Sequence, residues 1–138
     1  MMAIKKDSGS ILRLLTGTLG AGTILFSLPP ILAPRAFAVF FGLPHDAAAA
    51  KVGIRSVGVR DLMNGIGLLA TMSDPSRSSR WLLVRFVSDS GDALACRLAS
   101  AEAPKDWRLR LLGNVAAGAA LVSGALLAWS HIQRAASR

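Results

Sequence analysis

Cysteine, tyrosine and acidic residues are scarce in this chain, and each shortage excludes a class of protein. Cys96 is the single cysteine, so the chain cannot form an internal disulfide and is not a disulfide-stabilised scaffold. There is no tyrosine and only 6% of the residues are aromatic, so the surfaces on which single-stranded nucleic acid stacks are poorly supplied. We therefore expect no nucleic-acid partner.

The balance of charge and hydropathy favours a membrane protein. There are 8 acidic residues against 16 basic ones, a net charge of +8, yet 52% of the 138 residues are hydrophobic and the mean hydropathy is +0.47. A soluble nucleic-acid binder would explain the charge but not the hydropathy. A protein whose partner is the lipid bilayer explains both, because its Lys and Arg side chains can lie at the membrane surfaces. The length suits one domain.

Four apolar stretches approach the roughly 20 residues that a helix needs to cross the hydrocarbon core. They are residues 11–28, 52–72, 81–99 and 111–132. The polar turn at residues 73–80, with its Asp74-Pro75 breaker, makes the second and third helices antiparallel neighbours. The sequence therefore predicts an all-α, polytopic membrane protein: one domain over residues 1–138, with four transmembrane helices in an antiparallel bundle.

Prolines mark the end of the first span. Pro29 and Pro30 remove backbone donors, so we expect the first helix to stop near them. Residues 31–43 are apolar but too short to cross the bilayer, which indicates a short interfacial segment after helix 1. The Ala36-Phe37-Ala38 pattern resembles a signal-peptide cleavage site. The apolar run before it is long for a signal, and three further spans need packing partners, so we expect residues 11–28 to be retained as a span.

The basic residues near the span ends indicate an orientation. Seven lie on one side of the membrane, namely Lys5, Lys6, Arg13, Arg77, Arg80, Arg134 and Arg138, and five on the other, namely Arg35, Lys51, Lys105, Arg108 and Arg110. The positive-inside rule then places both termini in the cytoplasm. We expect a multi-pass protein of the plasma membrane or, in a bacterium, the inner membrane. Arg55 and Arg97 lie near span ends and are expected to reach the lipid headgroups.

Five charged residues lie deeper inside the second and third spans, where an unpaired charge is costly. They are Arg60, Asp61, Arg85, Asp89 and Asp92. At about 100° per residue, the last three share one helical stripe with Cys96, and the first two share another with Asn64. Each of the two helices therefore carries a polar face.

The two polar faces match in depth. Asp61 and Asp92 each lie 11 residues from the turn-side ends of their spans, and Asn64 and Asp89 each lie 8 residues from them. At about 1.5 Å per residue, Asp61 and Asp92 lie near the middle of the membrane. We therefore expect Arg60, Asp61 and Asn64 to face Asp89 and Asp92 across one interface, with Arg85 nearer the turn.

This buried group is formally negative, with three aspartates against two arginines. Burial and neighbouring carboxylates favour the protonated form of a carboxyl, so we expect one aspartate to hold a proton and to act as an acid, a base or a ligand. The catalytic candidates are Asp61, Asp89, Asp92, Arg60 and Arg85, and the binding candidates are Asn64 and Cys96. The alternative is an ionic network that only joins two helices, although a closed network would more naturally be neutral.

Metal and cofactor sites have little support in the sequence. Asp89 and Asp92 have the spacing of an aspartate-rich magnesium motif, but magnesium keeps several waters and would need a larger aqueous cavity than four helices easily provide. His45 and His131 lie far apart in the chain. No phosphate-binding glycine loop is present. We therefore expect no metal and no cofactor.

Several short motifs together resemble a known family. They are Phe41-Gly42-Leu43-Pro44, Gly58-Val59-Arg60-Asp61, Asn64-Gly65, and Arg85 with Asp89 and Asp92. This set resembles a bacterial and fungal family of small four-helix membrane proteins of unknown function and, distantly, the DoxX-like proteins. The resemblance implies a four-span bundle with the Arg and Asp residues inside, and it supplies no activity. Some DoxX-like proteins are accessory subunits of membrane redox complexes, but this chain has no cysteine pair or haem-ligand pair for that role.

Three functions agree with these features, and whether the protein is an enzyme stays open. The first is an intramembrane pocket that binds a small lipophilic molecule, with acid-base chemistry of an isomerase or cyclase type. The second is a non-catalytic accessory subunit or scaffold with a membrane-protein partner. The third is a small proton-coupled transporter, which would require a homodimer because four helices are few for alternating access.

Overall fold

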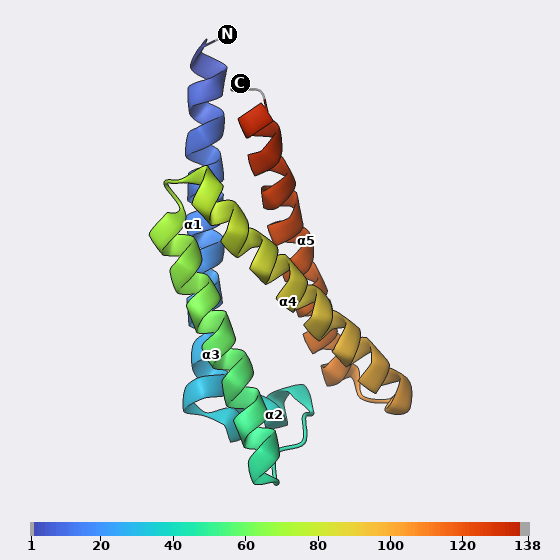
Figure 1. Cartoon of the computed structure of the whole chain (residues 1–138). Helices are drawn as coiled ribbons and strands as arrows, with labels where there is room; N and C mark the ends of the chain where they lie inside the picture. Colours follow the sequence, from blue (N-terminus) through green and yellow to red (C-terminus); the bar gives the residue numbers. More distant parts are fainter. Residues whose placement is uncertain (1, 136–138) are drawn as a thin grey trace.

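The computed structural model describes residues 2–135, with side chains from residue 9 onward. This part of the chain is all-α, as predicted, with no strand (Figure 1). Its helices are α1 (Met2–Leu32), α2 (Pro34–Phe41), α3 (Ala48–Thr71), α4 (Pro75–Glu102) and α5 (Trp107–Ala135). Of the residues counted for the orientation, Arg138 and the side chains of Lys5 and Lys6 lie outside the described part.

The four long helices form two pairs. α1 packs along α3 and α4 packs along α5, whereas α3 and α4 are antiparallel and diverge from their shared turn (Figure 1). One buried leucine from each long helix joins the pairs near that turn, namely Leu12, Leu68, Leu82 and Leu126. Beyond this core the two pairs separate. The second and third predicted spans are therefore neighbours over only part of their lengths.

Glycines explain why α3 pairs with α1. A Cβ atom on Gly65 would lie 2.8 Å from the Gly20 carbonyl oxygen, and one on Gly58 would lie 3.0 Å from the Ser27 carbonyl oxygen. Both distances are too short for an ordinary contact, so only glycine allows the α3 backbone to approach α1 this closely. Between α4 and α5, Gly124 lies against the ring of Phe86.

The prediction that the first helix stops near its prolines is confirmed, since α1 ends at Leu32, two residues after Pro30. Pro29 and Pro30 lie inside the last turn of α1, which continues to Leu32. A proline removes one donor and disturbs the preceding turn, so two prolines this close to the end shorten the helix little.

Arg55 is exposed, and its Nε donates to the Ile31 carbonyl at 3.4 Å, at the end of α1. α2 then begins at Pro34 and ends at Phe41, and the capping residue Gly42 has a positive φ of 69°.

The loops around α4 are shorter than predicted. Residues 76–80 were expected in the turn, but α4 begins at Pro75. The Asp74 carboxylate accepts hydrogen bonds from the backbone amides of Ser76 at 2.9 Å and Arg77 at 3.2 Å. These bonds satisfy free donors at the start of the helix, so the polar residues that follow can be helical. The link between the third and fourth predicted spans, expected over residues 100–110, is likewise reduced to residues 103–106.

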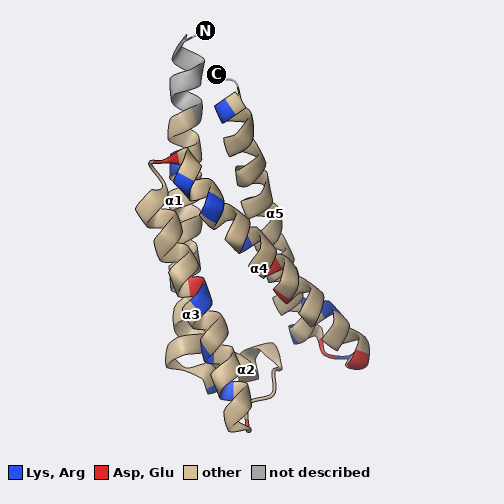
Figure 2. Cartoon of the chain, in the orientation of Figure 1, with Lys and Arg blue, Asp and Glu red and all other residues tan. Residues whose placement is uncertain are grey.

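Two helices are long and apolar enough to cross a membrane. They are Gly9–Leu32 of α1 and Trp107–Ala135 of α5. Only 28% of the most apolar 18-residue stretch of the first, and 17% of that of the second, is buried in the protein. Leu25, Leu32 and Leu121 are among the large apolar side chains that they leave exposed. α3 and α4 are long enough, but they carry too many charged residues to count as apolar. Figure 2 shows charged residues in the middle of both helices.

Candidate functional site

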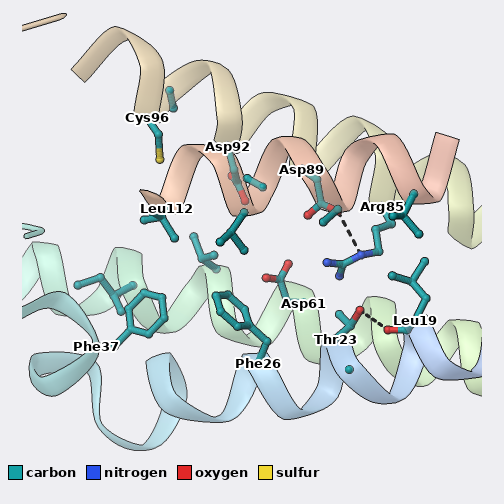
Figure 3. Close-up of a pocket in the computed structure, with 18 of the residues that line it drawn as sticks. Leu19, Thr23, Phe26, Phe37, Asp61, Arg85, Asp89, Asp92, Cys96 and Leu112 are labelled. Atoms are coloured by element: carbon teal, nitrogen blue, oxygen red, sulfur yellow. Dashed lines mark hydrogen bonds and ion pairs between the residues drawn. The ribbon is translucent and has the colours of Figure 1, made fainter. Parts of the chain in front are cut away.

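A cavity of about 710 Å³ lies where the two helix pairs separate (Figure 3). All five helices contribute to its walls, which are mostly apolar, and its four charged side chains come from α3 and α4. These are Asp61, Arg85, Asp89 and Asp92. The volume lies within the roughly 300–1,000 Å³ that is typical of small-molecule sites.

Aromatic side chains close the apolar end of the cavity. Phe26 of α1 and Phe37 of α2 both line it, and their ring centroids are 6.0 Å apart in an edge-to-face arrangement. Phe41 packs on Phe37 with centroids 4.8 Å apart. The short α2, predicted as an interfacial segment, thus provides one wall of the cavity.

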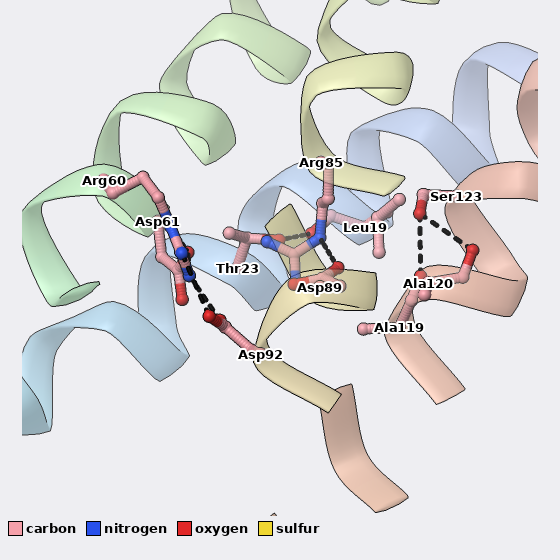
Figure 4. A network of polar contacts seen from close by, with 10 residues as sticks. All are labelled: Leu19, Thr23, Arg60, Asp61, Arg85, Asp89, Asp92, Ala119, Ala120 and Ser123. Atoms are coloured by element: carbon pink, nitrogen blue, oxygen red, sulfur yellow. Dashed lines mark hydrogen bonds and ion pairs between the residues drawn. The ribbon is translucent and has the colours of Figure 1, made fainter. Parts of the chain in front are cut away.

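Arg60 connects the two helix pairs at the polar end (Figure 4). Its Nη1 donates to Asp92 Oδ1 at 3.1 Å and its Nη2 to Asp92 Oδ2 at 2.5 Å, so the contact is bidentate. The same guanidinium donates from Nε and Nη2 to Asp61 Oδ1, at 3.2 and 3.0 Å. Asp61 and Asp92 therefore meet at one guanidinium, in agreement with their equal distances from the turn.

Arg85 and Asp89 form a second, more deeply buried ion pair within α4. Arg85 Nε lies 3.1 Å from Asp89 Oδ2, and the two side chains are only 8% and 5% exposed. The Arg85 guanidinium makes no hydrogen bond to any described residue, and its Nη1 is fully buried. Figure 3 shows this guanidinium extending from α4 toward Asp61.

Two carboxylates keep an oxygen without a partner. Asp61 Oδ2 and Asp89 Oδ1 have neither a hydrogen bond nor an ion pair with the part of the chain that the structure describes. Asp89 Oδ2 has its ion pair with Arg85 but accepts no hydrogen bond, whereas Asp92 uses both oxygens on Arg60. Three aspartates and two arginines leave a formal charge of −1 at this end of the cavity. The site therefore presents acceptor oxygens from two helices beside the Arg85 guanidinium, whose N–H donors make no hydrogen bond to the described residues.

The two binding candidates lie in different surroundings. Asn64 is buried on α3 and does not line the cavity; it makes no hydrogen bond to Asp89 or Asp92, and its Nδ2 has no partner among the described residues. Cys96 lines the cavity and also a second one, of about 460 Å³, between α4 and α5. Arg97, which was expected at the headgroups, lines this second cavity.

Glycine residues of the cavity wall were missed in the sequence. Gly22 of α1 and Gly53 of α3 both line the cavity, and a Cβ atom on either would meet nothing within 4 Å. Glycine in the middle of a helix is unfavourable, but no signal in the sequence marks these two as cavity residues, since Gly91 and Gly118 are also helical glycines with nothing within 4 Å and line neither cavity.

Histidines do not join this site. His45 Nδ1 lies 3.1 Å from the Leu43 carbonyl oxygen, and His131 is exposed on α5. Among the residues that the structure describes, no group of three His, Cys, Asp or Glu side chains could hold a metal ion.

The comparison with known proteins gives a family. Residues 20–131, most of the chain, match the family model described as a domain of unknown function, DUF4267. No curated protein and no solved structure matches the chain. The match includes the helices that carry both ion pairs and confirms the prediction of a family of unknown function. The chain belongs to the DUF4267 family.

Proposed function

We propose that this protein spans the membrane four times, binds a small lipophilic molecule in the main cavity, and transfers a proton on it through Asp61 and Asp89. The observation that carries the proposal is the cavity itself, which has apolar walls along most of its length and unpartnered carboxylate oxygens at one end. An apolar pocket with a few convergent polar groups is the usual form of a small-molecule site.

The outer faces of α3 and α4 support four spans. At about 1.5 Å per residue, their 24 and 28 residues exceed the roughly 30 Å of a hydrocarbon core. Their exposed side chains include Val59, Met63, Val87 and Leu94, whereas their central charges pair with one another beside the cavity. Charged residues in transmembrane helices typically face the protein interior in this way.

The proton chemistry would use one aspartate as a base and another as an acid. In an isomerisation, a carboxylate accepts a proton from one carbon of the bound molecule, and a protonated carboxyl gives a proton to another carbon, so no atom is gained or lost. Asp61 and Asp89 each have one oxygen in an ion pair with an arginine and one without a partner among the described residues. The formal excess of one negative charge is relieved when one of the two is protonated.

Mass spectrometry of small molecules that co-purify with the protein tests the binding step. Gly22→Leu would place a side chain in the cavity, and we expect this variant to lose the bound molecule. Gly118→Leu is the matched control, because Gly118 is also a helical glycine with nothing within 4 Å but lines neither cavity. Equal recovery from both variants, or a protein partner and no small molecule in mild detergent, would favour an accessory subunit instead.

Asp61→Asn tests the proton step. The amide keeps the shape and can still accept a bond from Arg60, so the variant should insert and retain the co-purified molecule. Conversion of that molecule in membranes should fall by about 10²-fold or more, the usual contribution of a general acid or base. Full conversion by Asp61→Asn and by Asp89→Asn would exclude the chemistry and leave only binding.

A further inference from the structure

The Arg85 guanidinium has more donors than the protein uses. A guanidinium has five N–H donors, and Arg85 meets a single acceptor, Asp89 Oδ2, at 3.1 Å in an ion pair. The side chain is more than nine-tenths buried and borders the cavity. Buried donors without a partner are costly, so such a group calls for an acceptor that the described chain does not provide.

The surrounding charges restrict what that acceptor is. Asp61, Asp89 and Asp92 all border the same end of the cavity, and Arg60 is already shared between two of them. A carboxylate or phosphate on the bound molecule would add a further negative charge to a group that already has a formal charge of −1. An uncharged oxygen would satisfy the guanidinium without this repulsion.

We propose that the molecule bound in the cavity is an uncharged lipophilic carbonyl compound whose oxygen accepts hydrogen bonds from Arg85. This inference rests on the proposed function and names its substrate class. A carbonyl also suits the proton chemistry, because a donor on its oxygen stabilises the negative charge that develops there when a base removes a proton from the adjacent carbon. Asp61 and Asp89 lie close to the Arg85 guanidinium (Figure 3), and each has an oxygen without a partner among the described residues to accept and return that proton. The alkyl part would lie toward Phe26 and Phe37.

Native mass spectrometry in detergent with four probes of one chain length tests the inference. The probes are methyl undecyl ketone, tridecane, tridecanoate and tridecylamine, each offered at the same concentration to the wild-type protein. We expect the ketone to bind about tenfold more tightly than tridecane, since a hydrogen bond from a charged donor contributes at least this much. Tridecanoate and tridecylamine should bind less than the ketone.

A paired variant shows whether Arg85 is responsible. Arg85→Gln with Asp89→Asn removes both members of the ion pair, so neither charge is left unpaired. We expect ketone binding to fall to the level of tridecane, while tridecane binding is unchanged. The matched control is Arg77→Gln with Asp74→Asn, which removes another ion pair of 3.2 Å near the start of α4, away from the cavity, and should keep the preference for the ketone.

The outcomes separate this inference from the proposed function. Equal binding of ketone and tridecane, or tighter binding of tridecanoate or tridecylamine, would overturn the carbonyl inference and leave a lipophilic cavity. Binding of no probe would overturn both. The wild-type comparison decides the matter even if the paired Arg85 variant does not fold.

Discussion

Arg60 on α3 binds both carboxylate oxygens of Asp92 on α4, at 3.1 and 2.5 Å, and this contact joins two helix pairs that otherwise separate beyond their leucine core. The same guanidinium holds Asp61 on its own helix. The position of α4 relative to α3 at the cavity therefore depends on the Arg60 side chain.

Arg60→Lys should destabilise the protein. An ammonium is a point charge and cannot make the planar bidentate contact with Asp92 while also reaching Asp61. Because the side chains of Arg60 and Asp92 are each 34% exposed, we expect a loss between the values for surface and buried pairs, about 1–3 kcal/mol. Thermal unfolding in detergent measures it. Arg13 is exposed and has no partner among the described residues, so Arg13→Lys should change the stability little. An equal loss of stability in both variants would contradict the role of Arg60.

Gly65→Ala should loosen the α1–α3 pair. A Cβ atom there would lie 2.8 Å from the Gly20 carbonyl oxygen and 2.7 Å from Ile24 Cγ1, so the backbones must move apart at a cost of about 1–3 kcal/mol. Gly53→Ala on the same helix is the control. Its Cβ meets nothing within 4 Å, so the better helix propensity of alanine should leave stability unchanged or raised by up to about 1 kcal/mol. The close approach of α1 and α3 is refuted if both variants behave alike.

Asp74 should make stability depend on acidic pH. Hydrogen bonds from the Ser76 hydroxyl and from the backbone amides of Arg77 and Ser76 lower the pKa of Asp74 below its ordinary value. A lowered pKa in the folded state stabilises the fold above the ordinary value near 4, and this stabilisation is lost as the pH falls through the lowered one. Asp74→Asn keeps a good helix cap but cannot titrate. The difference in unfolding temperature between wild type and Asp74→Asn should shrink below about pH 4; a constant difference would argue against this role.

Cysteine accessibility should show whether α4 crosses the membrane. In a Cys96→Ser background, we expect Ser73→Cys in the turn before α4 and Ala103→Cys in the loop after it to react with a membrane-impermeant maleimide from opposite sides of sealed vesicles. The positive-inside rule places the first on the cytoplasmic side, with the termini. Labelling of both from one side would mean that α4 does not cross.

The sequence was sufficient for the helices and for which charged residues of α3 and α4 lie together, although Arg60 and Asp92 remain 34% exposed. Helical periodicity and the short turn at Asp74 place Asp61 and Asp92 at equal distances from it, and the structure brings both to Arg60. These properties are local, because spacing along a helix and distance from a turn depend only on neighbours in the chain. The ends of the helices were less accurate, since the Asp74 cap allows helix where composition suggested a break.

Only the tertiary structure decided which helices pair and where a cavity remains. Residue spacing on α3 and α4 favoured a close interface between these two helices, but the glycines of α3 bring α3 against α1 instead. The separation of the two helix pairs then leaves the cavity that Gly22 and Gly53 border. The same separation leaves the Arg85 guanidinium with a single acceptor. Pairing of this kind depends on the fit of whole surfaces that are distant in the chain, which no local spacing of residues encodes.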